Sequence, residues 1–312
     1  MKNVYWEYYH PNKKDFDEMK KNALFVFDAC SLLNMYSLSD SKMNEIFSIL
    51  ESLRKEKRVW IPHQFGEEYY KGRQSKIAQQ FDQYDNAKKN LDKIVAMPIF
   101  SDFTNHYAIN EKEIREKIKN TIEEIKKNID QQKNKHPDWR TQDTVCERIE
   151  KIFEGNIGNK YSDDLLGEKI EEVKNRMELK KQPGLSDNRS LSQEKINGDV
   201  FGWLQIIDHV NKIKKPAILV TDEKKADYWE EKKKSDRVFP RRSLIREFFD
   251  KTGQLFFILS TDEFLQFNNK KISYLPIYPE IGGEDVLQEN VDDIVIGSEV
   301  IGSEINNQLT NK

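Results

Sequence analysis

Residues 22–34 of the chain read NALFVFDACSLLN, and this stretch decides the fold. Its five apolar residues, 23–27, stand between the polar residues Asn22 and Asp28. A short, unbroken apolar run with polar ends is typical of a strand buried on both faces of a parallel sheet. An unpaired carboxylate is very costly to bury, so we expect Asp28 at the carboxyl edge of that sheet.

Three more apolar runs of strand length follow along the chain: residues 58–61, 217–221 and 255–259. Segments with helical spacing of apolar residues separate them: 40–53, 62–95, a helix expected to begin at Asp199, and 243–249. Strands that alternate with helices in this way predict an α/β fold, in which helices flank a parallel sheet.

Residues 96–180 have a different character, and we interpret them as a helical arm inserted into the α/β domain. Isoleucines within 114–129 recur at spacings of four, four, three and four, on a helix otherwise rich in Lys and Glu. The simplest interpretation of these charges is a solvated face, and a nucleic-acid clamp is the alternative. The expected division is therefore as follows: N-terminal arm 1–22, α/β domain 23–95 and 181–267, helical arm 96–180, and acidic C-terminal tail 275–312.

Composition excludes several classes of protein. The 51 Lys and Arg against 54 Asp and Glu give a net charge of −3, which excludes a uniformly basic surface but not a local basic patch. No apolar stretch approaches the roughly 18 residues of a transmembrane helix, so no membrane partner is expected. Two cysteines, Cys30 and Cys146, cannot build a disulfide scaffold, and we expect a cytoplasmic setting. No Walker or dinucleotide-binding glycine motif occurs.

Acidic residues gather where strands end and helices begin. Asp28 and Asp222 follow two of the strands, Glu68 and Asp199 lie near helix starts, and Asp227 lies five residues beyond Asp222. Ligands bind at the carboxyl ends of parallel strands, and all five positions map to that edge. For a single Asp after a strand, a helix cap is the simpler explanation. Several close carboxylates, however, repel one another unless a cation is present, and Mg²⁺ or Mn²⁺ suits such oxygen ligands.

Residues 25–34, FVFDACSLLN, resemble the first-strand motif of PIN-domain nucleases. Further blocks resemble, in order, the PIN-like branch of bacterial proteins: 60–69, 198–207, 220–229 and 260–265. The resemblance spans roughly residues 20–267 and implies a Rossmann-type parallel sheet. It also implies a set of metal ligands and one supporting acid: Asp28, Glu68, Asp199 and Asp222, with Asp227 in support. Glu68 is preferred to Glu67, since adjacent helical residues point about 100° apart.

The activity that the resemblance implies is a Mg²⁺- or Mn²⁺-dependent endoribonuclease, with DNA as the other polymer to consider. Toxin action, RNA decay and phage defence are associated biological settings. Arg73, Lys224 and Lys225 are candidate phosphate contacts, although a solvated surface charge is the simpler interpretation of each. Cys30 is a poor ligand for a hard cation, so we expect it to pack near the site. Thr221 is expected to pack at its strand end, with a hydrogen bond to an acid as the alternative.

Two other functions fit the same sequence. A catalytically inactive PIN-like module would bind RNA or protein, and would assemble with a partner or a second copy through the helical arm or the C-terminal tail. A phosphotransfer enzyme would use Asp28 as its nucleophile. That second alternative lacks the acid expected two residues further on, where Cys30 stands.

Overall fold

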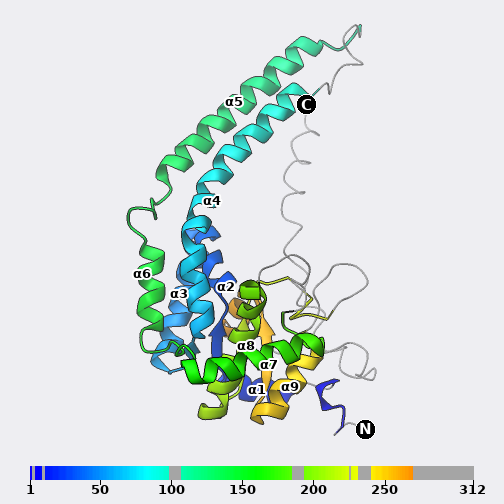
Figure 1. Ribbon diagram of the computed structural model, residues 1–312. Coiled ribbons are helices and arrows are strands. Elements are labelled where there is room, and N and C mark those ends of the chain that lie inside the picture. The colour runs from blue at the N-terminus through cyan, green and yellow to red at the C-terminus, as the bar shows by residue number, and fades with distance from the viewer. Residues whose placement is uncertain are drawn as a thin grey trace.

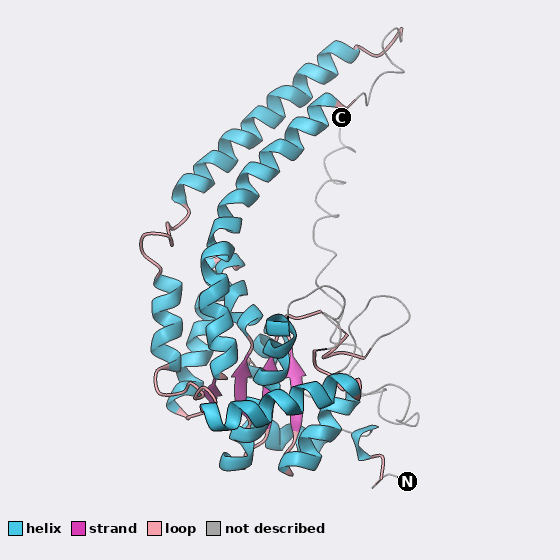
Figure 2. Cartoon of the chain, viewed as in Figure 1, coloured by secondary structure: helices cyan, strands magenta, loops and turns pink. Residues whose placement is uncertain are grey.

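The computed structural model describes residues 1, 4–8, 11–97, 107–184, 193–224, 226–230 and 240–269. Within these residues one parallel sheet forms, in the order β2-β1-β3-β4. Its strands are the four predicted apolar runs: β1 Leu24–Phe27, β2 Val59–Trp60, β3 Ala217–Val220 and β4 Phe256–Leu259. The arrows of these strands lie side by side and point the same way (Figure 2). The predicted α/β fold is confirmed, whereas the predicted acidic tail 275–312 lies outside the described residues.

Helices cover both faces of this sheet. The described helices are α1 Lys13–Asn22, α2 Ala29–Asn34, α3 Asp40–Lys55, α4 His63–Ala96, α5 Glu111–Lys135, α6 Thr144–Phe153, α7 Asp163–Glu178, α8 Gln193–Ile213, α9 Arg242–Thr252 and α10 Thr261–Asn268. The described residues also include two 3₁₀ turns: η1 Trp6–Tyr8, which precedes α1, and η2 Met35–Ser37, which lies between α2 and α3.

On one face the β1 side chain Phe27 contacts Phe264 of α10 and Phe153 of α6, at ring separations of 5.3 and 5.8 Å. On the other face Phe256 of β4 contacts Trp203 of α8 and Phe248 of α9, at 5.1 and 4.7 Å. The register aligns β1, β3 and β4 so that their carboxyl ends, at Phe27, Val220 and Leu259, lie level.

A helical hairpin made of α4 and α5 extends from this body (Figure 1). The 34 residues of α4 correspond to about 51 Å of helix. Cross-helix ion pairs join Lys88 to Asp130 at 2.6 Å and Lys133 to Asp85 at 2.8 Å. The chain returns to the body through α6 and α7, which contact α3 and α8 respectively.

The N-terminal segment docks on the body. Trp6 packs on Phe249 of α9 at 4.5 Å, and Arg246 donates a hydrogen bond to the main-chain oxygen of Val4 at 2.9 Å. The helix that follows, α1, buries Phe16 and Met19 in the main core. Across the described part of the chain, no helix is both long enough and apolar enough to span a membrane.

Two glycines test the close packing of α8. A Cβ placed on Gly202 would overlap the ring of buried Phe65 of α4, so Gly202→Ala should lower the free energy of unfolding by about 1–3 kcal/mol through overpacking. A Cβ on Gly167, at an exposed position of α7, meets nothing within 4 Å, so Gly167→Ala should raise the free energy of unfolding by about 1 kcal/mol. Urea denaturation of the full chain checks both, and equal effects of the two variants would contradict this packing.

Candidate active site

Asp28 lies where β1 ends and α2 begins, with only 8% of its surface exposed. It occupies the cap position of α2, yet its side chain makes no capping hydrogen bond. Its Oδ2 instead accepts hydrogen bonds from Thr221 Oγ1 at 2.6 Å and Cys30 Sγ at 3.1 Å. The carboxylate is therefore directed to the end of β3, and Thr221 does more than the strand-end packing that we expected.

These contacts act on the titration of the carboxyl group. Burial raises the pKa of Asp28 above its usual range, and the hydrogen bonds from Thr221 and Cys30 oppose that rise. Burial and the charge of Asp28 also raise the pKa of the Cys30 thiol. The thiol therefore stays protonated and acts as a neutral donor beside Asp28.

Glu68 of α4 approaches Gly198 of α8 where these two helices pack against each other. The Glu68 carboxylate accepts a hydrogen bond from Gln64 Nε2 at 2.8 Å and approaches the backbone of Gly198 so closely that a Cβ there would overlap it. Asp199 follows Gly198 in α8, so its backbone lies next to the residue that contacts Glu68. The predicted helix start at Asp199 is wrong. The helix begins at Gln193, and the residues up to Gly198 already belong to α8.

The loop after β3 brings in the next acid. Asp227 is 1% exposed and lies in a loop that two side chains fix through hydrogen bonds to main-chain oxygens. Trp229 Nε1 donates to the oxygen of Glu223 at 2.7 Å, and Arg241 Nε donates to the oxygen of Ala226 at 2.8 Å. The loop is therefore anchored on both sides of Asp227.

One tyrosine shows how these acids are arranged. Tyr228 is 1% exposed, and burial raises its pKa well above the usual range. Four carboxylates raise it further through their charge, in decreasing order Asp199, Asp28, Glu68 and Asp227. Four of the five predicted acids therefore lie close enough to one buried phenol to act on it electrostatically.

Asp222 is held in a different network. Its Oδ2 accepts hydrogen bonds from Asn34 Nδ2 at 2.9 Å and Thr261 Oγ1 at 2.8 Å, and its Oδ1 accepts one from the Thr261 main-chain nitrogen at 2.9 Å. Lys76 Nζ in turn donates to Asn34 Oδ1 at 3.0 Å. Asp222 thus joins the ends of α2 and β3 to the start of α10.

Comparison with protein families decides the relationship of this chain. A family model described as a PIN-like domain matches residues 24–244, which include the five predicted acids. The chain belongs to the PIN-like domain family. The resemblance found in the sequence is confirmed, and membership places the chain in a superfamily of nuclease type. No curated protein and no solved structure matches it.

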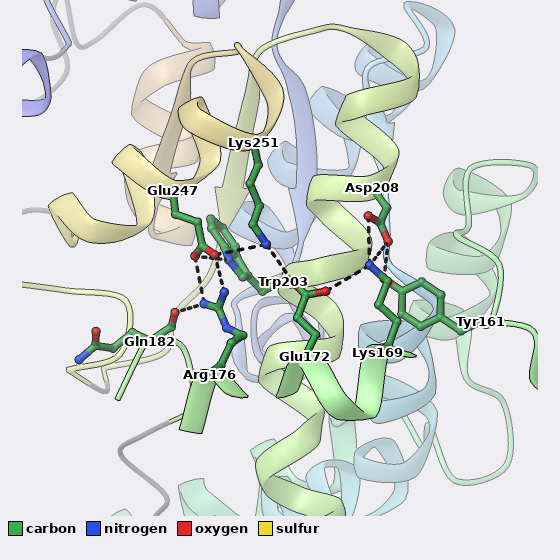
Figure 3. A network of polar contacts seen from close by, with 9 residues as sticks. All are labelled: Tyr161, Lys169, Glu172, Arg176, Gln182, Trp203, Asp208, Glu247 and Lys251. Carbon is green, nitrogen blue, oxygen red and sulfur yellow. Dashed lines mark hydrogen bonds and ion pairs between the residues drawn. The ribbon is translucent and has the colours of Figure 1, made fainter. Parts of the chain in front are cut away.

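A buried polar network holds the PIN-like domain's α8, which carries Asp199. Figure 3 shows Arg176 of α7 between Glu247 of α9 and the main-chain oxygen of Gln182. Glu247 also accepts a hydrogen bond from Trp203 Nε1 of α8 at 3.1 Å. Further along α8, Asp208 pairs with Lys169 of α7 at 3.0 Å. These contacts join α7, α8 and α9 to one another.

The predicted phosphate contacts have unequal surroundings. Arg73 forms an ion pair with Asp143 at 3.2 Å, and its side chain is 23% exposed. Lys224 is exposed, two residues beyond Asp222, and Lys225 lies outside the described residues. Of the three, Lys224 has the most accessible described side chain.

Sequence reasoning gave no role to Tyr228, Asn34 or Gly198. The order of residues offered a signal for two of them, because Tyr228 follows Asp227 and Gly198 precedes Asp199. Nothing in the spacing marked Asn34 as a partner of Asp222, 188 residues away.

The raised pKa of Asp28 makes stability depend on pH. Below about pH 3.8, the ordinary value, the carboxyl is protonated whether the chain is folded or not. As pH rises from there through the raised pKa, the unfolded chain loses its proton first, so the wild type loses stability. Asp28→Asn in EDTA should avoid that loss and gain relative stability towards pH 7, by about 1.4 kcal/mol per unit of pKa shift.

Urea denaturation between pH 4 and pH 8 measures this effect. Asp85→Asn, on the exposed part of α4, is the matched control, and its surface ion pair should contribute little. Parallel stability curves for wild type and Asp28→Asn would show that burial does not govern the Asp28 carboxyl.

Proposed function

We propose that this PIN-like protein is a metal-dependent endoribonuclease that hydrolyses phosphodiester bonds with water. The observation that carries the proposal is that Asp28, Glu68, Asp199 and Asp227, from four separate segments, all act through their charge on buried Tyr228 and raise its pKa. Like charges gathered in this way favour a bound cation, and hard divalent cations prefer carboxylate oxygens.

The donor set fits Mg²⁺ or Mn²⁺ held partly through water. Among the described residues, no group of three or more His, Cys, Asp or Glu side chains is arranged to hold an ion directly. Mg²⁺ usually keeps several waters and takes only one or two carboxylates, so such a closed cage is not required. The proposed ligands, direct or through water, are Asp28, Glu68, Asp199 and Asp222, with Asp227 in support.

When bound, the ion lowers the pKa of a water and stabilises the negative charge that develops on the phosphodiester. Thr221 and Cys30 orient the Asp28 carboxylate for this role. Asp222 has three hydrogen bonds to its two oxygens and retains acceptor capacity at Oδ1. No covalent intermediate is proposed, and the products would carry a 5′-phosphate and a 3′-hydroxyl.

The substrate we propose is RNA in the cytoplasm, with DNA as the alternative polymer. Lys224 is the proposed phosphate contact with the clearest access, and Lys225 is its neighbour. For Arg73 to serve in the same way, its ion pair with Asp143 would have to be exchanged for a phosphate.

A second candidate is an inactive PIN-like module that binds RNA or protein. The hairpin of α4 and α5 favours it, since this arm extends away from the body (Figure 1). Such a module would engage a protein partner, or a second copy of the chain, through the arm or the C-terminal tail.

Cleavage assays on structured RNAs and single-stranded DNA, with Mn²⁺ or EDTA, test the first proposal. Asp28→Asn should slow Mn²⁺-dependent cleavage by about a hundredfold or more, because a charge facing the reaction is lost. Asp222→Asn tests its assignment as a ligand in the same way, and Asp85→Asn on the arm should cleave like wild type.

Calorimetric titration with Mn²⁺ completes this test. Undiminished cleavage by Asp28→Asn, or cleavage in EDTA, would contradict the metal-dependent site. Absence of both cleavage and Mn²⁺ binding would favour the binding module.

A further inference from the structure

Tyr228 is a buried residue whose ring and hydroxyl have different surroundings. The ring belongs to the main hydrophobic core, and the Tyr228 main-chain oxygen accepts a hydrogen bond from the Arg241 nitrogen at 2.9 Å. The hydroxyl is buried, and no described residue forms a hydrogen bond with it. Buried polar atoms almost always have a partner, so this hydroxyl calls for an explanation.

Other buried or half-buried tyrosines of the chain do have partners. The Tyr36 hydroxyl lies 2.8 Å from Asp143 Oδ2 and 3.0 Å from the Tyr69 hydroxyl. The Tyr161 hydroxyl donates to Asp208 at 2.7 Å. Tyr228 differs from them although it has more carboxylates nearby, since four acids act on it through their charge.

We propose that the Tyr228 hydroxyl is part of the divalent-cation site and hydrogen-bonds the water that accompanies the ion. This inference rests on the proposed function. Carboxylates only accept hydrogen bonds, whereas a phenol both donates and accepts. The Tyr228 hydroxyl can therefore accept a hydrogen bond from a water on the cation and donate one to a nearby carboxylate. The ionised acids around it cannot donate. Tyr228 is thus a positioning residue of the site.

A contact made through water suits a hard cation such as Mg²⁺, which usually keeps several waters when it is bound. Asp227 and Tyr228 share one anchored loop, so ordering the acid also orders the hydroxyl. Partners beyond the direct ligands typically contribute 10–100-fold to metal affinity, which sets the scale of the expected effect.

Tyr228→Phe in the full chain, with Mn²⁺ alone as the probe, tests the inference. The variant keeps the ring and loses the hydroxyl, so the Kd for Mn²⁺ measured by calorimetry should rise by about tenfold or more. In EDTA its Tm should equal or exceed that of wild type, because a buried hydroxyl without a partner is removed.

Tyr36→Phe is the matched control. It removes a buried hydroxyl that has partners, so it should lower the Tm in EDTA and leave the Kd for Mn²⁺ unchanged. Equal Mn²⁺ affinity of Tyr228→Phe and wild type would overturn the assignment while leaving the proposed function intact. No Mn²⁺ binding by wild type would overturn both.

A measurement on the wild type does not depend on the folding of a variant. Mg²⁺ added to protein labelled with ¹³C at tyrosine Cζ should shift one resonance among the 12 tyrosines, and the shifted signal should be missing in Tyr228→Phe. If no tyrosine resonance moves at a Mg²⁺ concentration that saturates the site, the hydroxyl is not part of it.

Discussion

Four carboxylates that act on one buried hydroxyl repel one another, and the folded chain has to hold them in place against that repulsion. The parallel register of β1 and β3 provides the base, since it sets Asp28 beside the end of β3. Close contact of α8 with α4 adds Glu68 and Asp199, and an anchored loop adds Asp227. Each acid is placed by a different part of the core, so no single local contact has to balance the whole electrostatic repulsion between them.

Small side chains and buried charge pairs are the means by which α8 is positioned. Gly198 and Gly202 stand one turn apart on its α4 side, where a Cβ would overlap Glu68 or Phe65. On its other side, Trp203 donates to Glu247, which also pairs with the almost completely buried Arg176. A helix that is close-packed on one side and hydrogen-bonded on the other has little freedom to move Asp199.

The fold was predictable from the sequence because its signals are local. Each strand is a short apolar run with polar ends, and the order of elements dictates a parallel sheet. The family, too, follows from blocks in the right order. The environment of Asp222 was not predictable, because its partners Asn34 and Thr261 come from helices far away in the chain. The start of α8 was also misjudged, since Gly198 before Asp199 is a weak helix former whose place is set by contact with Glu68.

The pairing of β1 with β3 has a consequence for how the protein is made. Asp28 and Thr221, which hydrogen-bond in the folded chain, are 193 residues apart. Long-range parallel pairing is slow, because a large loop must close before the contact forms. During synthesis, the ribosome has to release the segment that forms β3 and its following loop before the acids can meet. A nascent chain that holds only Asp28 and Glu68 lacks the other acids, so the acidic residues come together only after residues 217–227 have left the ribosome.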